Sequence, residues 1–358
     1  MKKIGIYIHI PFCRSKCSYC DFYSLTDESK KERYIDRVIQ EMAYYKNKNI
    51  IADTLFIGGG TPSLLTPKQV EKLILTCKDV FSLNGEITME ANPDSVSEEY
   101  LKEIFENGVN RISFGAQSAI NNELSSLGRR HNKNQITEAV NFAKKAGFKN
   151  ISLDIMLGIP YQTNESLEKT LDFMTSLGIQ HLSCYLLKIE EGTPFYRNQI
   201  QKLCADEDKT ADFYLKTVDY LQKEGFSQYE ISNFAKKGFE SKHNLKYWNC
   251  EEYLGFGVAS HSFYNGKRFF HSPSIEKYLA SEDFAIISDG EGGDIKEQIL
   301  LKLRLNKGVE VSLLPKEVYE KANPFIKNGL MALENDRLSF TPKGFLVSNV
   351  ILSELLLG

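Results

Sequence analysis

The chain has 358 residues, of which 42% are hydrophobic and 25% charged, a composition that is ordinary for globular proteins and excludes disordered, collagen-like and coiled-coil classes. Its 44 Lys and Arg against 47 Asp and Glu give a net charge of −3, so no overall attraction to nucleic acid or anionic lipid is expected. No uncharged apolar run reaches the roughly 18 residues of a membrane span, and the first residues lack the pattern of a signal peptide. We therefore expect a cytoplasmic protein without a nucleic-acid partner.

Short β-rich runs alternate with amphipathic helical stretches from the amino terminus to about residue 235. Glycine-led loops of similar sequence, such as Gly108–Ser113 and Gly147–Ser152, separate the helices from the strands that follow them. This alternation predicts an α/β fold of parallel βα units, closed into a partial or full barrel. The expected strands are Gly5–Ile10, Thr54–Gly58, Glu86–Glu90, Arg111–Gly115, Asn150–Gly158 and His181–Leu187, with a further run at Tyr229–Asn233.

Two capping-box patterns, Thr66–Gln69 and Ser95–Glu98, predict helix starts within this region. The sequence pattern changes after Asp294, where apolar residues recur at helical spacing and Leu338–Thr341 forms a short expected strand. This pattern predicts a small, mainly helical domain with a hairpin, similar to a winged helix. Residues 290–358 hold nine basic and nine acidic residues, which disfavours DNA binding. We expect three parts, 1–235, 236–289 and 290–358, with Ser288–Gly293 as a linker.

Three of the seven cysteines, Cys13, Cys17 and Cys20, lie within eight residues directly after the first expected strand. Loops at the carboxyl ends of barrel strands carry function, and three thiolates can hold three irons of a 4Fe-4S cluster, leaving the fourth iron open to a small molecule. Two alternatives are weaker: a buried helix face carrying the cysteines, and a zinc site completed by His9.

The segment from Tyr7 to Cys20, YIHIPFCRSKCSYC, resembles the cluster loop of radical S-adenosylmethionine (SAM) enzymes, in the HemN/HemW branch named for oxygen-independent coproporphyrinogen III oxidase. The resemblance extends along nearly the whole chain. It implies a partial (β/α)6 barrel, a 4Fe-4S cluster on the three cysteines and SAM bound at the open iron. The residues that it assigns to SAM binding are Tyr7, Tyr19, Gly59, Gly60, Thr61, Glu90, Gln117, Arg129 and Asp154.

Two features separate this sequence from the oxidases of the branch. Phe22 stands where the oxidases carry a fourth cysteine, and His243–Trp248 matches the HNxxYW element of HemW-type proteins, whose likeness continues to His261. The resemblance therefore implies a haem chaperone that donates haem to membrane haemoproteins and lacks coproporphyrinogen III dehydrogenase activity. It implies transient association with those membrane partners, and a homodimer is compatible with it.

The expected haem ligand is His243, with His261 and Cys250 behind it. A coproporphyrinogen III oxidase, or another tetrapyrrole-acting radical SAM enzyme, is the alternative function. An RNA-modifying enzyme ranks last, because neither a basic patch nor an added RNA-binding module is evident.

Overall fold

The computed structural model describes residues 3–356 and contains a curved sheet whose first six strands are parallel. These strands are β1 (Lys3–Ile10), β2 (Ile51–Gly59), β3 (Glu86–Ala91), β4 (Arg111–Gln117), β5 (Ile151–Leu157) and β6 (His181–Leu186). All six expected strands are present, and their order in the sheet follows their order in the chain. The predicted partial (β/α)6 barrel is confirmed.

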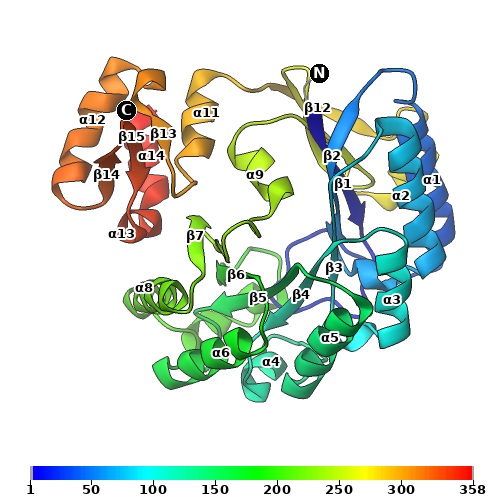
Figure 1. Cartoon of the computed structure of the whole chain (residues 1–358), viewed down its shortest axis with the longest axis horizontal. Coiled ribbons are helices and arrows are strands. Elements are labelled where there is room, and N and C mark those ends of the chain that lie inside the picture. The colour runs from blue at the N-terminus through cyan, green and yellow to red at the C-terminus, as the bar shows by residue number, and fades with distance from the viewer. Residues whose placement is uncertain (1–2, 357–358) are drawn as a thin grey trace.

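Helices cover the outer face of this arc, as Figure 1 shows. They are α1 (Lys31–Ala43), α2 (Pro67–Phe81), α3 (Glu98–Glu106), α4 (Asn121–Ser126), α5 (Lys133–Ala146), α6 (Asn164–Ser176) and α8 (Glu207–Lys223). The capping box at Thr66 and Gln69 is confirmed at the start of α2. The one expected at Ser95 is wrong, because Ser95 ends a short 3-10 turn (Pro93–Ser95) and Ser97 caps α3 by accepting from the Tyr100 amide.

Alternation along β1 decides which side chains face the helices. Ile4, Ile6, Ile8 and Ile10 are at most 2% exposed and pack into the main core. Side chains alternate across a strand, so Gly5, Tyr7 and His9 lie on the opposite, inner face of the arc. The same alternation on the other strands places polar side chains on the inner face. The barrel interior is therefore able to bind a polar ligand.

The sheet continues beyond the parallel strands at both ends, to twelve strands in all within the described chain. Beside β6 lie β8 (Asn233–Ala235) and β7 (Ser227–Glu230), an antiparallel pair where a single strand was expected. Beside β1 lie β9 (Tyr253–Phe256), β10 (His261–Tyr264), β11 (Lys267–His271) and β12 (Ile286–Glu291). The segment 288–293, expected to be a linker, is thus largely part of an edge strand.

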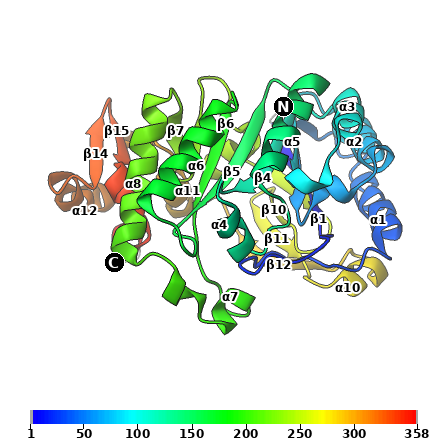
Figure 2. The ribbon, with the colours of Figure 1, turned by 90° about the horizontal axis from the view of Figure 1, so that it is seen from below.

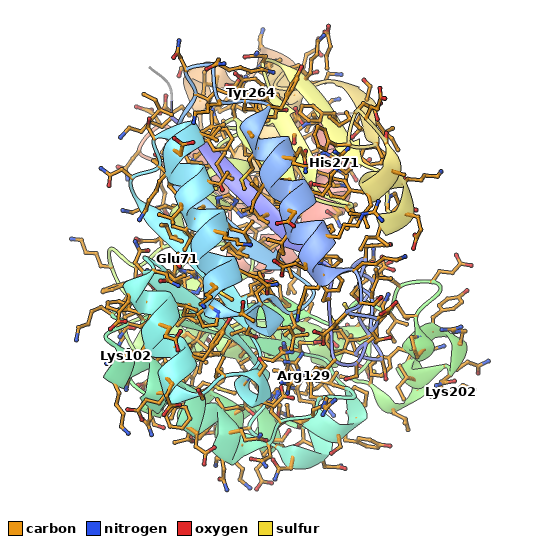
Figure 3. The ribbon with its side chains drawn as sticks, turned by 90° about the vertical axis from the view of Figure 1, so that its right-hand side faces the viewer. Glu71, Lys102, Arg129, Lys202, Tyr264 and His271 are labelled. Atoms are coloured by element: carbon orange, nitrogen blue, oxygen red, sulfur yellow. The ribbon has the colours of Figure 1, made fainter. Side chains whose placement is uncertain are left out.

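Two short helices attach this extension to the rest. Helix α9 (Lys242–Trp248) lies inside the arc (Figure 1), and α10 (Ile275–Ala280) lies near α1. The His271 ring nitrogen lies 2.6 Å from the Glu41 carboxylate of α1, and Figure 3 shows His271 between α1 and the yellow strands. The Tyr278 hydroxyl of α10 donates to the same carboxylate at 2.6 Å. A buried polar cluster therefore fixes the extension to the barrel.

The carboxyl-terminal part is a small three-stranded sheet with helices, as predicted for a winged-helix-like unit. Its elements are α11 (Ile295–Lys302), β13 (Val309–Glu310), α12 (Lys316–Lys327), β14 (Met331–Glu334), β15 (Arg337–Phe340), α13 (Pro342–Leu346) and α14 (Ser348–Leu356). Figure 1 places it on the open side of the arc. None of the helices in residues 3–356 combines the length and apolar character needed to cross a bilayer.

Candidate functional site

The three clustered cysteines lie in an irregular loop at the carboxyl end of β1. Long-range backbone bonds hold this loop: the Cys13 amide donates to Leu25 at 2.9 Å, and the Ser18 amide donates to Leu127 at 3.3 Å. The loop is not helical, so the alternative of a buried helix face is wrong. All three thiols are partly exposed and free of disulfides.

Two side chains from outside the cysteine loop, one after β2 and one after α4, donate to the cysteine sulfurs. The Thr61 hydroxyl donates to Cys13 Sγ, and the Arg129 guanidinium donates to Cys17 Sγ, each at 3.5 Å. Hydrogen bonds to sulfur tune the potential of an iron–sulfur cluster. Gly60 is required beside them, because a Cβ there would lie 2.8 Å from the Phe12 carbonyl and 3.0 Å from Cys13 Sγ.

The donor set fits an iron–sulfur cluster and not a zinc ion. No group of three His, Cys, Asp or Glu side chains in residues 3–356 is close enough to hold one metal ion. In a cluster each cysteine binds a different iron, so the sulfurs need not converge on one point. His9, the expected fourth zinc ligand, is buried and bonded through both ring nitrogens, to the Tyr7 hydroxyl and the Tyr23 carbonyl. These contacts of His9 disfavour the zinc alternative.

A cleft of about 440 Å³ opens beside these cysteines, at the carboxyl ends of the strands. Eight of the nine expected SAM-binding residues line it together with the cysteines: Tyr19, Gly59, Gly60, Thr61, Glu90, Gln117, Arg129 and Asp154. Tyr7 is the exception. It lies deeper on the inner face of β1, where its ring packs 6.2 Å from that of Phe56.

Arg129 is held at the edge of the cleft by three neighbours, and Figure 3 labels its position. Besides Cys17, its guanidinium donates to the Gly115 carbonyl at 2.6 Å and to the Asn92 amide oxygen at 2.7 Å. A Cβ on Gly115 would lie 3.0 Å from the Arg129 guanidinium, so the glycine leaves room for it. The cleft thus contains a fixed positive charge beside the cysteine loop.

Two half-buried carboxyl groups face the same cleft. Burial, with a contribution from Asp154, raises the pKa of Glu90 to about 8, and the Glu90 carboxylate accepts from the Gly59 amide at 3.0 Å. Burial also raises the pKa of Asp154, whose carboxylate accepts from Ser113 at 3.0 Å. Such paired acidic groups can accept hydrogen bonds from the amino and hydroxyl groups of a cationic ligand.

His243 lies at the other end of the barrel, within α9. It is 0% exposed, and its ring nitrogens bond to the Thr54 hydroxyl at 2.9 Å and the Tyr247 hydroxyl at 2.7 Å. The first turn of α9 also donates backbone amides to Glu86. Helix α9 therefore closes the amino-terminal end of the barrel, and neither His243 nitrogen is open to a haem iron in this arrangement.

The other two expected haem ligands lie elsewhere and do not converge with His243. His261 is exposed at the start of β10, and its ring stacks on Phe270 with centroids 5.1 Å apart. Cys250 is partly exposed in the turn after α9, with a positive φ of 56°. His131, unassigned from the sequence, is buried and bonds to the Ala116 carbonyl.

Asn92 is the main site residue that sequence reasoning missed. It bonds both Thr61 and Arg129, and so connects the two side chains that donate to cysteine sulfurs. Its position directly after β3 was the available signal, since polar residues at the carboxyl ends of parallel strands line such clefts. The cleft rim also includes Phe22, Tyr185 and Leu186, which are exposed apolar side chains without a sequence motif.

Comparison with known proteins agrees with this geometry. The family model described as the radical SAM superfamily matches residues 7–174, and the HemN C-terminal domain model matches residues 294–347. The solved structure of coproporphyrinogen III oxidase HemN from Escherichia coli aligns with a TM-score of 0.85, covering 99% of this chain and 90% of that chain at 21% identity. At this identity the alignment supports the shared fold alone.

Two curated relatives are more similar in sequence. The haem chaperone HemW of Lactococcus lactis is 34% identical over 99% of this chain and 98% of its own length. The haem chaperone HemW of Bacillus subtilis is 38% identical over 85% of this chain and 84% of its own length. The chain therefore belongs to the HemW family of radical SAM proteins.

Proposed function

We propose that this chain is a haem chaperone, which binds haem and donates it to haemoproteins, including membrane haemoproteins. The full-length similarity to curated haem chaperones carries this proposal. The exposed Phe22, in place of a fourth loop cysteine, supports it over the oxidase alternative. We further propose a cytoplasmic location and a homodimeric state.

We propose that Cys13, Cys17 and Cys20 hold a 4Fe-4S cluster. The proposed SAM contacts are Tyr7, Tyr19, Gly59, Gly60, Thr61, Glu90, Gln117, Arg129 and Asp154. A cluster with SAM at its open iron supplies one-electron chemistry when it is bound. The support is the loop geometry and the cleft that eight of these nine residues line.

The chain's own side chains give this cleft a defined polarity. Arg129 and Thr61 place donors against two cysteine sulfurs. Glu90 and Asp154 place acidic groups on the inner strands, where a ligand with a positive charge would meet them. Helix α9 packs against the amino-terminal end of the barrel, through contacts with Thr54 and Glu86.

The proposed function is tested by paired assays on the cluster-containing protein. Haem titration followed by transfer to an apo-haemoprotein should show saturable binding and loss of haem to the acceptor. Anaerobic incubation with SAM, reductant and coproporphyrinogen III should yield no protoporphyrinogen. Product formation without haem binding would contradict the chaperone proposal and support the oxidase.

A further inference from the structure

The six histidines of the chain differ sharply in what their rings can reach. Five are at most 4% exposed, and each has at least one ring nitrogen in a hydrogen bond or ion pair: His9, His131, His181, His243 and His271. His261 is exposed, and within residues 3–356 no hydrogen bond to either of its ring nitrogens is formed. His261 is thus the histidine that an external metal centre can approach without disrupting the fold.

Apolar side chains continue from His261 across the edge of the sheet. His261 of β10 pairs with Phe270 of β11, and Phe270 pairs with Ile287 of β12. Directly paired residues share one face of a sheet, so the three side chains form a row. We call this the His261 row. The imidazole and Phe270 rings are nearly parallel, at 20°, and Ile287 is 41% exposed.

The opposite face of β10 and β11 is occupied, since Ser262 and His271 are at most 1% exposed there. His271, next to Phe270 in β11, points to that face and lies against the Glu41 carboxylate of α1. The polar cluster around Glu41 fixes these strands from behind. On the face of the His261 row, Arg268 pairs with Glu297 of α11, and the row lies beside this contact with His261 and Ile287 exposed. An exposed row of one imidazole, one aromatic ring and one aliphatic chain is a short, flat surface.

The charge state of His261 suits metal ligation. Burial lowers the pKa of His261, and Asp289, two residues beyond Ile287, opposes this change. The neutral imidazole, which is the form that ligates iron, therefore predominates at pH 7.

We propose that His261 is an axial ligand of haem iron and that the porphyrin covers the row formed with Phe270 and Ile287. This inference rests on the proposed haem-chaperone function and names the surface that performs it. The apolar porphyrin requires flat apolar cover, which Phe270 and Ile287 offer. An axial histidine on an open sheet edge, instead of in a closed pocket, also allows the haem to dissociate to an acceptor protein.

The test is titration of ferric haem into the full-length, cluster-containing wild type and three variants, followed by Soret absorbance and electron paramagnetic resonance. The variants are His261→Ala, His243→Ala and Ser288→Ala. Ser288 pairs with Phe269 on the opposite face of the same strands, so its variant is the matched control. His261→Ala should raise the Kd at least about tenfold and remove the imidazole-ligated signal, and added imidazole should restore that signal.

The outcomes test the His261 haem site separately from the haem-chaperone function. Wild-type binding with an unchanged Kd and spectrum in His261→Ala would overturn the His261 site and leave the chaperone proposal standing. Loss of the imidazole signal in folded His243→Ala, but not in His261→Ala, would assign the ligand to His243 and overturn the proposal. Absence of haem binding in the wild type would overturn both.

Discussion

Replacing His243 by alanine should destabilise the protein strongly, because this side chain is a structural part of the barrel floor. The His243 ring is fully buried and is the hydrogen-bond partner of the Thr54 and Tyr247 hydroxyls. Truncation leaves a cavity, and it leaves both hydroxyls without their partner. Truncating a large buried side chain costs about 2–5 kcal/mol, and each orphaned buried polar group costs about 1–3 kcal/mol.

Partial relaxation of the surroundings places the expected loss in the free energy of unfolding at the lower end of the combined range, about 4–6 kcal/mol. The effect should also depend on pH. Burial lowers the pKa of His243 to about 3, against an ordinary value of 6.5. The unfolded chain therefore binds a proton that the folded chain does not, so the stability contributed by this neutral histidine is present above pH 6.5 and is lost as the pH falls. Between pH 7 and pH 5 the difference between wild type and variant should shrink by about 2 kcal/mol.

Urea unfolding of both proteins at pH 7 and pH 5, monitored by circular dichroism, measures these quantities. His261→Ala is the matched control, and its stability should stay near that of the wild type because the side chain is exposed. An unchanged midpoint in His243→Ala, or a stability difference from wild type that does not vary with pH, would refute the structural role of His243.

Three further predictions concern the cleft. Raising the pH from 7 to 9 should strengthen SAM binding up to about tenfold, because the Glu90 carboxyl, with a pKa of about 8, becomes the carboxylate that attracts a cation. Calorimetry should find a smaller gain in Glu90→Gln. An equal gain in both proteins would exclude Glu90 as the source of the pH dependence. Gly115→Ala should weaken SAM binding by about 1–3 kcal/mol, because its Cβ would press on the Arg129 guanidinium; an unchanged Kd would contradict this. Alanine at all three loop cysteines should abolish bound iron and labile sulfide after reconstitution, and stoichiometric iron in that variant would disprove the cluster assignment.

Much of the barrel could be predicted because its strands carry local signals. The apolar run of β1 and the Thr66 capping box determine their own geometry. Ser95 shows the limit of such signals: two serines lie in sequence before α3, and either could cap it. The turn at Pro93 takes up the first, so Ser97 becomes the cap. A competing turn is visible only in three dimensions.

The candidate site shows the same division. The cysteine spacing indicates a cluster loop by itself, whereas the role of His243 depends on contacts with Thr54 and Glu86, which are more than 150 residues away. The sequence alone does not distinguish the exposed His261 from the buried His243. Only burial and hydrogen bonding distinguish a side chain that supports the fold from one that can bind a ligand.

Helix α9 has a consequence for the order in which molecules enter and leave the barrel. Helix α9 packs against the amino-terminal end of the barrel, and the cleft beside the cysteines opens at the opposite end, at the carboxyl ends of the strands. A small molecule bound deep in the cleft and a bulkier one resting above it would then obey a last-in, first-out rule. Release of the deeper occupant would then wait for departure of the upper one.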